Sequence, residues 1–215
     1  MFTGLIEEVG ILKSFYKTSL GARMCVYAPK ISPELKIGES VSINGACSTV
    51  VKFSQDSFEV EYSNHTLSLT NFEQLKTNSK LNLERSLKLS DRLDGHIVTG
   101  HIDCITPLLD IKKDGFSHQF VFKLPKEYSA HIVKKGAISI NGISLTVAGC
   151  DSESFFVEII PHTIEYTNLK ELSIGENVNI ETDITAKYIE KILLAKDNIK
   201  ENKIDMNFLA DKGFI

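Results

Sequence analysis

The sequence contains two copies of one pattern, and this duplication constrains the fold more than any other feature. When the 215-residue chain is compared with itself, long ungapped segments of the two halves match at a shift of 97 residues, or 96 near the start of each half. Solenoid repeats are shorter, about 20–50 residues. We therefore expect a duplicated domain, with copies at residues 1–95 and 96–183. The clearest matches pair Ser42-Ile43-Asn44-Gly45 with Ser139-Ile140-Asn141-Gly142, His65-Thr66 with His162-Thr163, and Thr3-Gly4-Leu5-Ile6 with Thr99-Gly100-His101-Ile102.

Each copy is expected to be a small β-barrel. Ser40–Ile43 and Ala137–Ile140 alternate apolar and polar residues, which is typical of half-buried strands. Each segment runs directly into Asn-Gly, the dipeptide that most strongly predicts a two-residue hairpin, because both positions tolerate positive φ. Short strands at close spacing, with little helix between them, favour a closed barrel that leaves no exposed edge. Further strands are expected at residues 49–53, 58–62, 145–148 and 155–160.

Residues 184–215 have no counterpart in the first half and form a third segment. Apolar residues recur there at helical spacing, and Asp183 stands where it could cap the start of a helix. The apolar stripe needs cover, which either the barrels or a second copy of the chain could supply. We expect the tail, Lys203–Ile215, to dock through its apolar side chains. The stripe consists of Ile184, Tyr188, Ile192 and Ile199, with Ile189, Leu193 and Ala195 beside it.

Charge and composition argue against several classes of function. A net charge of −4 and a pI near 5.9, without a cluster of basic residues, argue against a nucleic-acid partner. The N-terminus lacks the regions of a signal peptide and no stretch is long enough to span a bilayer, so we expect a cytoplasmic protein without a membrane partner. The sequence has no GxGxxG turn, which argues against a flavin-dependent reductase with a nucleotide-binding βαβ unit.

The cysteines and histidines do not form a metal-binding pattern. No cysteines form a CxxC pair, so we expect free thiols rather than a zinc site. His96 and His101 are five residues apart, a spacing that would put them on opposite faces of a strand, and no ligand cluster accompanies them. His118 and His131 have no motif around them and are expected at the surface. The cysteines are Cys25, Cys47, Cys104 and Cys150.

Four segments together resemble the riboflavin synthase family. The resemblance runs in order from residue 1 to about residue 200 and rests on an MFTG start, two NGxxxTV segments and a GHxxxGH between them. It implies two six-stranded Greek-key barrels and a C-terminal helix that holds a homotrimer. It also implies that the facing barrels of a site come from neighbouring subunits. The segments are Met1–Glu7, Asn44–Val50, Gly95–His101 and Asn141–Val147.

The resemblance also implies a reaction. Two molecules of 6,7-dimethyl-8-ribityllumazine exchange a four-carbon unit to give riboflavin and 5-amino-6-(D-ribitylamino)uracil, without a metal, flavin or nicotinamide cofactor. A duplicated fold suits this reaction because two equivalent sites can hold two copies of one substrate in opposed orientation, an effect worth up to roughly 7–11 kcal/mol of barrier. The alternative is a non-catalytic lumazine or flavin carrier of the same fold. An association with lumazine synthase is left open.

The motif match places the substrate-binding residues in paired groups. Gly4-Leu5-Ile6 and Gly100-His101-Ile102 are expected along the pteridine ring, where glycine permits close backbone approach. Cys47-Ser48-Thr49 and Ser144-Leu145-Thr146 follow the two Asn-Gly turns and carry groups suited to the ribityl chain and the heterocycle. Lys135 is expected to reach in from the second barrel. The walls are completed by Glu61, Tyr62, Ser63, Asn64, His65 and Thr66 in the first half and by Ile160, Pro161, His162, Thr163, Ile164 and Glu165 in the second.

The reaction requires a base and a nucleophile. The acceptor must lose a proton from its 7-methyl group, the donor must be activated at C7, and a well-placed general base contributes roughly 10²–10⁴-fold. The candidate catalytic residues are Cys47, His101, Ser144 and Asp183, and the nucleophile is left open because water or a ribityl hydroxyl could also serve. The resemblance is imperfect at Ser48 and His65, where the family usually has Leu and often Glu, and this leaves the contacts of the first barrel open.

The two halves differ where the chemistry must be asymmetric. Both sites are expected to bind the same molecule, yet one lumazine ends as donor and the other as acceptor. Cys47 pairs with Ser144 in the repeat, and Leu5 pairs with His101. A thiol is the stronger nucleophile when it is ionised. We therefore expect the first barrel to activate its substrate and the second barrel to hold the partner substrate.

Overall fold

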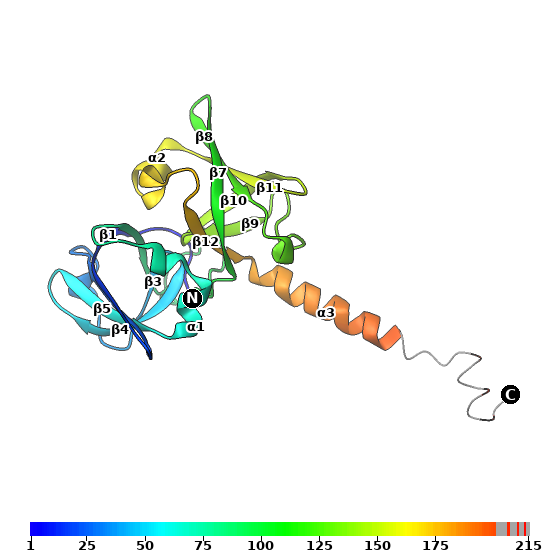
Figure 1. Cartoon of the computed structure of the whole chain (residues 1–215), viewed down its shortest axis with the longest axis horizontal. Helices are drawn as coiled ribbons and strands as arrows, with labels where there is room; N and C mark the ends of the chain where they lie inside the picture. Colours follow the sequence, from blue (N-terminus) through cyan, green and yellow to red (C-terminus); the bar gives the residue numbers. More distant parts are fainter. Residues whose placement is uncertain (201–205, 207–209, 211–212, 214–215) are drawn as a thin grey trace. The chain divides into compact units, whose positions relative to one another are not determined.

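The computed structural model describes residues 1–200 together with residues 206, 210 and 213. The chain divides into two compact units, residues 1–183 and residues 184–215. The first unit contains two closed six-stranded antiparallel barrels (Figure 1), and this confirms the predicted duplicated-barrel fold. The docking predicted for the tail, Lys203–Ile215, falls on residues that lie largely outside those described.

The first barrel has the strand order β1-β2-β5-β4-β3-β6 and closes through the pairing of β1 with β6. Strand β5 pairs with β2 across the β3–β4 hairpin, which gives the barrel its Greek-key character. Two short helical segments follow β5. The elements are β1 (Glu8–Thr18), β2 (Gly21–Tyr27), η1 (Ser32–Glu34), β3 (Ser40–Ile43), β4 (Ala46–Phe53), β5 (Ser57–Tyr62), α1 (Asn64–Leu69), η2 (Asn71–Gln74) and β6 (Lys80–Arg85).

The second barrel repeats this order strand for strand, as β7-β8-β11-β10-β9-β12, with β12 paired to β7. The same two helical segments follow β11. Its elements are β7 (Cys104–Asp114), β8 (Ser117–Lys123), η3 (Lys126–Tyr128), β9 (Ala137–Ile140), β10 (Ile143–Cys150), β11 (Ser154–Ile159), α2 (Pro161–Glu165), η4 (Asn168–Glu171) and β12 (Asn177–Thr182).

The two predicted Asn-Gly hairpins are confirmed, and their tips meet. Asn44 and Gly45 have φ angles of 45° and 87°, and Asn141 and Gly142 have φ angles of 46° and 79°, as a type I′ turn requires. A Cβ atom added to Gly45 would lie 2.8 Å from the backbone nitrogen of Gly142, and one added to Gly142 would lie 2.7 Å from that of Gly45. Glycine is required here because the two barrels touch backbone to backbone at this point.

Repeated asparagines join the barrels around the hairpin tips. The Asn82 side-chain amide donates to the carbonyl oxygen of Asn141 at 2.9 Å, and the Asn179 amide donates to that of Asn44 at 2.9 Å. Asn82 also donates to Oδ1 of Asn168 at 2.8 Å. Buried amides need such partners, because an unpaired polar group in a core is costly. The repeat is therefore polar where the two copies contact each other.

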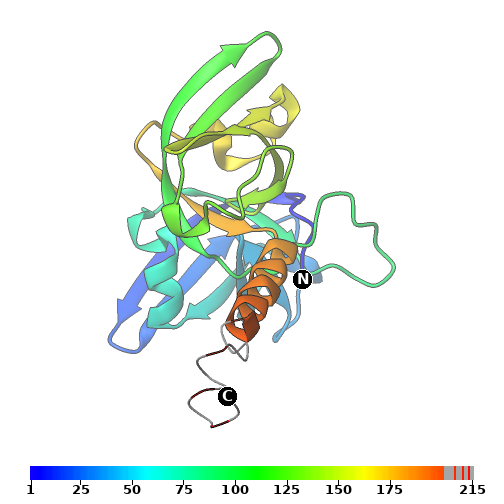
Figure 2. The same cartoon turned by 90° about the vertical axis from the view of Figure 1, so that its right-hand side faces the viewer.

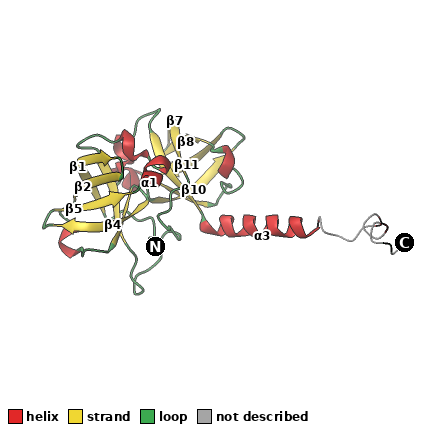
Figure 3. Cartoon of the chain, turned by 60° about the horizontal axis from the view of Figure 1, so that its bottom comes forward, coloured by secondary structure: helices red, strands yellow, loops and turns green. Residues whose placement is uncertain are grey.

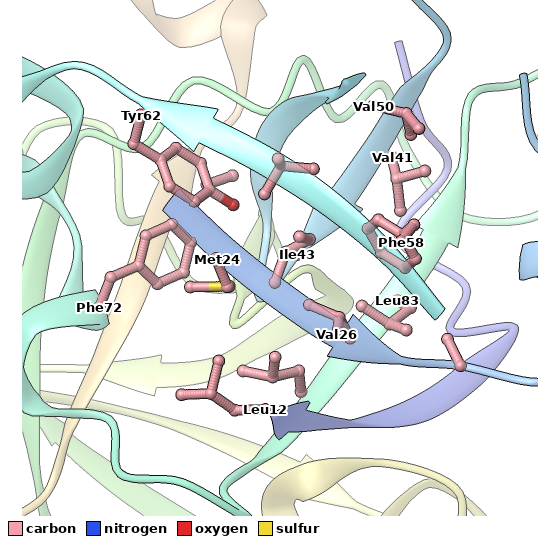
Figure 4. Close-up of a cluster of buried hydrophobic side chains, with 14 of the residues drawn as sticks. Leu12, Met24, Val26, Val41, Ile43, Val50, Phe58, Tyr62, Phe72 and Leu83 are labelled. Atoms are coloured by element: carbon pink, nitrogen blue, oxygen red, sulfur yellow. The ribbon is translucent and has the colours of Figure 1, made fainter. Parts of the chain in front are cut away.

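Each barrel encloses its own apolar core. Figure 4 shows the core of the first barrel, where Met24, Phe58 and Phe72 lie among aliphatic side chains from several strands. The ring of Tyr62 lies 4.8 Å from that of Phe72. The second core is a separate cluster in which the rings of Phe122 and Phe155 stack at 5.5 Å. Two separate cores are consistent with two copies of one folding unit.

Several features of the structure differ from the predictions. The long hairpins β1–β2 and β7–β8 and the short helices α1 and α2 were not predicted, although Asp114-Gly115 at the β7–β8 turn is a hairpin signal. His131 was expected at the surface, and this prediction is wrong: the residue is 8% exposed, its Nδ1 lies 3.3 Å from Oγ1 of Thr182, and its ring lies 6.0 Å from that of Tyr128. Histidine is an amphipathic side chain, so its burial depends on partners that only the fold supplies.

The second unit begins with the predicted helix. Helix α3 (Ile184–Lys200), drawn in red in Figure 3, starts directly after Asp183. Tyr188, Ile189, Ile192 and Leu193 on this helix are each more than half exposed. Among the described residues, no helix is long and apolar enough to cross a membrane.

Candidate active site

Each barrel is completed by a segment that precedes the other barrel. Ile102, which precedes β7, belongs to the core of the first barrel, whereas Ile6, which precedes β1, packs against the core of the second. The two segments cross where Phe2 and Val98 form an antiparallel bridge, with N–H to O distances of 2.7 and 3.1 Å. The connection between β6 and this crossing, residues 86–98, includes an open loop that extends from the barrels (Figure 2).

Gly4 and Gly100 are equivalent in the repeat, and the crossing places each of them against the hairpin of the opposite half. The Cys47 N–H donates to the carbonyl oxygen of Gly100 at 2.8 Å, and the Ser144 N–H donates to that of Gly4 at 2.8 Å. Both glycines have positive φ, 84° and 79°. A Cβ on Gly100 or Gly4 would lie 2.6 Å from the Cβ of Cys47 or Ser144. Only glycine allows this approach without displacement.

A cavity of about 260 Å³ opens beside Cys47 in the first barrel. The cavity lies between the β3–β4 hairpin, helix α1 and the segment Gly100–Ile102 from the second half. Cys47 and His101 therefore line the same cavity within a single chain. The volume is slightly below the roughly 300–1,000 Å³ that is typical of small-molecule sites. The lining residues are Ala46, Cys47, His65, Thr66, Leu69, Thr70, Gly100, His101 and Ile102.

Helix α1 fixes the wall that carries His65 and Thr66. Ser63 caps the helix, and its hydroxyl accepts a hydrogen bond from the Thr66 N–H at 3.2 Å. The Asn64 amide donates to the carbonyl oxygen of Ser19 at 3.0 Å, which ties the helix to the β1–β2 hairpin. Ser63 and Asn64 thus support the wall rather than line the cavity.

In the second barrel, Ser144 has a partner that the sequence analysis did not assign to the site. Nδ1 of His96 lies 2.7 Å from Oγ of Ser144. Burial lowers the pKa of His96 below its ordinary value of 6.5, and the charge of Asp183 opposes this shift. A neutral ring with its proton on Nε2 can therefore accept a hydrogen bond from the Ser144 hydroxyl at neutral pH. The sequence signal for His96 was the first Gly-His of the GHxxxGH motif. His96 was considered there as a metal ligand, and no role in the site was predicted for it.

Helix α2 forms the matching wall of the second barrel. The His162 and Tyr166 rings lie 4.6 Å apart, and both residues are exposed. Glu165 pairs with Lys170 at 2.7 Å. Ile164 packs against the core, while Pro161 starts the helix after the exposed Ile160, and Thr163 is half-buried.

Several predicted site residues do not line the first-barrel cavity. Ser48 is buried, donates to the carbonyl oxygen of Ala46 at 3.0 Å, and has its Oγ 2.6 Å from Oη of Tyr62. Burial raises the pKa of Tyr62 above its ordinary value, so the phenol stays protonated and both side chains belong to the barrel interior. Glu61 lies on the outer surface, where it pairs with Arg23 at 2.5 Å.

Of the remaining predicted residues, Thr49, Leu145 and Thr146 lie on the two β-hairpins, Lys135 precedes β9, and Leu5 precedes β1 and lines a different cavity, described below. Thr49 on β4 and Thr146 on β10 are exposed, and Leu145 packs against the second core. Lys135 is exposed and has a φ of 68°, and its N–H donates to the carbonyl oxygen of Val147 at 2.7 Å. Its backbone is therefore held beside β10 while its side chain is free to extend.

Two further cavities are lined by other described residues. One of about 370 Å³ lies among the asparagines that join the barrels, and one of about 460 Å³ lies beside Arg85, which pairs with Glu7 at 2.7 Å and Glu34 at 2.6 Å. Neither is lined by Cys47 or Ser144. Within the described residues, no three His, Cys, Asp or Glu side chains form a group that could hold a metal ion.

The fold and its paired sites define a protein of two tandem ligand-binding barrels. Residues 3–86 and 99–183 each match the lumazine binding domain. The chain is 42% identical to the riboflavin synthase of Actinobacillus pleuropneumoniae and 35% identical to that of Bacillus amyloliquefaciens, over 100% of both chains in each case. The chain belongs to the riboflavin synthase family.

Solved structures with the same fold hold flat heterocycles. A structure of LumP complexed with 6,7-dimethyl-8-(1'-D-ribityl) lumazine has a TM-score of 0.77 and 27% identity, and covers 85% of this chain and 99% of that one. The complex of LumP with riboflavin has a TM-score of 0.78 at the same identity and coverage.

Proposed function

We propose that the chain catalyses the riboflavin synthase reaction, in which two molecules of 6,7-dimethyl-8-ribityllumazine give riboflavin and 5-amino-6-(D-ribitylamino)uracil. The observation that carries this proposal is the pair of equivalent sites in one chain, each closed by a glycine segment against a hairpin. A reaction between two copies of one molecule needs two such sites. Holding the substrates in fixed orientation replaces a random encounter with an oriented step.

The two sites offer different chemistry. In the first, Cys47 and His101 line one cavity, so a thiol and an imidazole are available to the same ligand. In the second, Ser144 and His96 are hydrogen-bonded, which suits a hydroxyl that gives its proton to a neutral imidazole. We propose that the first site activates the donor and that the second holds the acceptor while its 7-methyl proton is removed. Asp183 supports His96 through its charge.

Purified protein should form riboflavin from 6,7-dimethyl-8-ribityllumazine in the presence of EDTA and without added cofactor. The proposed chemistry needs only protein groups and two substrate molecules. Riboflavin absorbance measures the turnover, and equilibrium dialysis of the lumazine measures binding. Tight binding without turnover would identify a carrier instead, and absence of both would remove the family's ligand from consideration.

We further propose that residues 1–95 and 96–183 are the two lumazine-binding domains and that residues 184–215 are an oligomerisation segment, in which α3 joins three copies of the chain. We also propose that the protein is cytoplasmic. The small volume of the first-barrel cavity supports an assembly in which a second barrel, from a neighbouring chain, covers the bound ring. The exposed apolar residues of α3 supply a contact surface. An association with lumazine synthase stays a prediction.

Replacing Ile192 on α3 by Glu should convert the assembly to a 24.0 kDa monomer and lower kcat/KM at least about tenfold, because a charge in an apolar contact is costly. Truncation after Asp183 should have the same effect. Analytical ultracentrifugation gives the mass, and Lys191→Glu on the same helix is the matched control. A fully active trimer after truncation would contradict the proposal.

A further inference from the structure

Two buried carboxylates lie outside the sites described above. Glu84 on β6 is 4% exposed and Glu181 on β12 is 1% exposed. They are equivalent in the repeat, at a shift of 97. A carboxylate in a barrel interior is costly unless hydrogen-bond donors surround it. In both cases the donors come from the crossing segments.

Glu181 holds the segment that enters the first-barrel cavity. Its Oε1 accepts hydrogen bonds from the N–H of Thr99 at 2.7 Å and from the Thr99 hydroxyl at 2.6 Å. Its Oε2 accepts the N–H of Gly100 at 2.9 Å. The Thr99 hydroxyl in turn accepts the N–H of His101 at 3.3 Å. Glu181 therefore holds Thr99 and Gly100 directly and His101 through the Thr99 hydroxyl, and both Gly100 and His101 line the cavity.

Glu84 makes the same set of bonds to the other segment. Its Oε1 accepts the N–H and the hydroxyl of Thr3, both at 2.6 Å, and its Oε2 accepts the N–H of Gly4 at 2.9 Å. The Thr3 hydroxyl accepts the N–H of Leu5 at 3.2 Å. Burial raises the pKa of Glu84, and the bonds from Thr3 and Gly4 oppose that shift.

The bonds continue from each carboxylate into the opposite barrel. Glu181 belongs to the second barrel and accepts the N–H of Gly100, whose carbonyl oxygen accepts the N–H of Cys47 in the first barrel. Glu84 belongs to the first barrel, but Gly4 receives the N–H of Ser144 in the second. Each barrel therefore orients part of the site in its neighbour.

We propose that Glu84 and Glu181 are positioning residues that act crosswise: Glu181 sets the geometry of the Cys47 site, and Glu84 sets that of the Ser144 site. Neither carboxylate needs to touch substrate for this role. The effect of these two residues on catalysis rests on the proposed function. Their effect on the geometry of the two sites is measurable in the ligand-free protein. A purely structural role would loosen both sites together.

Glu181→Gln and Glu84→Gln test the crosswise pattern, because an amide keeps the size of the side chain but replaces one acceptor oxygen with a donor. The first reporter is the rate at which iodoacetamide alkylates Cys47, resolved by peptide mass spectrometry with Cys150 as internal reference. The second is the NMR titration of His96, assigned with His96→Gln. Both are read in the full-length protein without ligand.

Glu181→Gln should change the Cys47 alkylation rate about tenfold and leave the His96 titration unchanged. A factor of about ten corresponds to the loss of one or two hydrogen bonds. Glu84→Gln should raise the pKa of His96 toward its ordinary value as the ring gains solvent, and leave Cys47 unchanged. Glu158→Gln is the matched control, because Glu158 is an exposed carboxylate bonded to Ser117 and Gln119 and should move neither reporter.

Thr99→Val and Thr99→Ser keep the test decisive if a glutamate variant does not fold. Valine removes the hydroxyl that links Glu181 to His101 and should reproduce the Cys47 effect in weaker form, whereas serine keeps the hydroxyl and should behave as wild type. The proposal would be overturned if both reporters changed equally or if neither changed. It would also be overturned if a substitution changed only the reporter in the barrel to which its glutamate belongs. A crosswise pattern without riboflavin formation would instead leave the proposal intact and reject the proposed function.

Discussion

Exchanging the two unequal hairpin residues, Cys47→Ser together with Ser144→Cys, should lower kcat by about tenfold or more and should not restore the rate lost in Cys47→Ser alone. The exchange moves the thiol but not the histidines. The new serine would share its cavity with His101, and the new thiol would lie beside His96. The thiol would then be absent from the site that we propose activates the donor.

Single-turnover absorbance and lumazine binding separate the causes of this loss. Binding should change little, because the exchange conserves volume closely and leaves both crossing segments in place. His101→Gln should also lower kcat by about tenfold or more with little effect on binding. Cys150→Ser, which alters an exposed thiol outside the site, is the control and should be fully active. Wild-type speed in the exchanged protein would show that the barrels are interchangeable.

Gly100→Ala should weaken lumazine binding at the first site by about tenfold to a hundredfold and destabilise the protein by about 1–3 kcal/mol beyond the cost of its positive φ. The added Cβ would lie 2.6 Å from the Cβ of Cys47 and 2.9 Å from its backbone nitrogen. Relief requires the Gly100 segment to move away, which lengthens the bond between the Gly100 carbonyl oxygen and the Cys47 N–H.

Gly38→Ala separates steric overlap from backbone strain. Gly38 has a φ of 89°, close to the 84° of Gly100, and nothing lies within 4 Å of its added Cβ. Lys135, the equivalent residue in the second barrel, already carries a side chain at a φ of 68°. Gly38→Ala should therefore show only the cost of the left-handed conformation, about 1–2 kcal/mol, with unchanged binding. Equal binding losses in both variants, measured by titration calorimetry, would contradict a close-packed crossing.

The sequence predicted the fold well because the repeat carries local signals twice. The strands at Ser40–Ile43 and Ala137–Ile140 follow from alternation, and the Asn-Gly turns follow from the positive φ that both residues tolerate. Helix α3 follows from its apolar period. The hairpins β1–β2 and β7–β8 escaped prediction, because their strands have no matching motif in the self-comparison and the Asp114-Gly115 turn of β7–β8 was overlooked.

The candidate site was predicted as a set of segments rather than as a geometry. Cys47, His101 and Ser144 were chosen for their chemistry and motif, and Ser48 was included as part of the matched Cys47-Ser48-Thr49 segment. In a strand, neighbouring side chains point to opposite faces, so Ser48 turns into the barrel beside Tyr62. His96 was passed over because its partnership with Ser144 is formed across 48 residues of sequence.

The sequence by itself determined the duplication, the strand-turn-strand core of each copy and the appended helix, since these depend on periodicity and on residues with special φ preferences. Only the tertiary structure decided which barrel each Thr-Gly segment completes. That choice depends on where Glu84 and Glu181 find their donors and where a glycine can approach Cys47 or Ser144. Long-range packing and buried hydrogen bonds leave no local pattern, and so the crosswise exchange of segments became visible only in the folded chain.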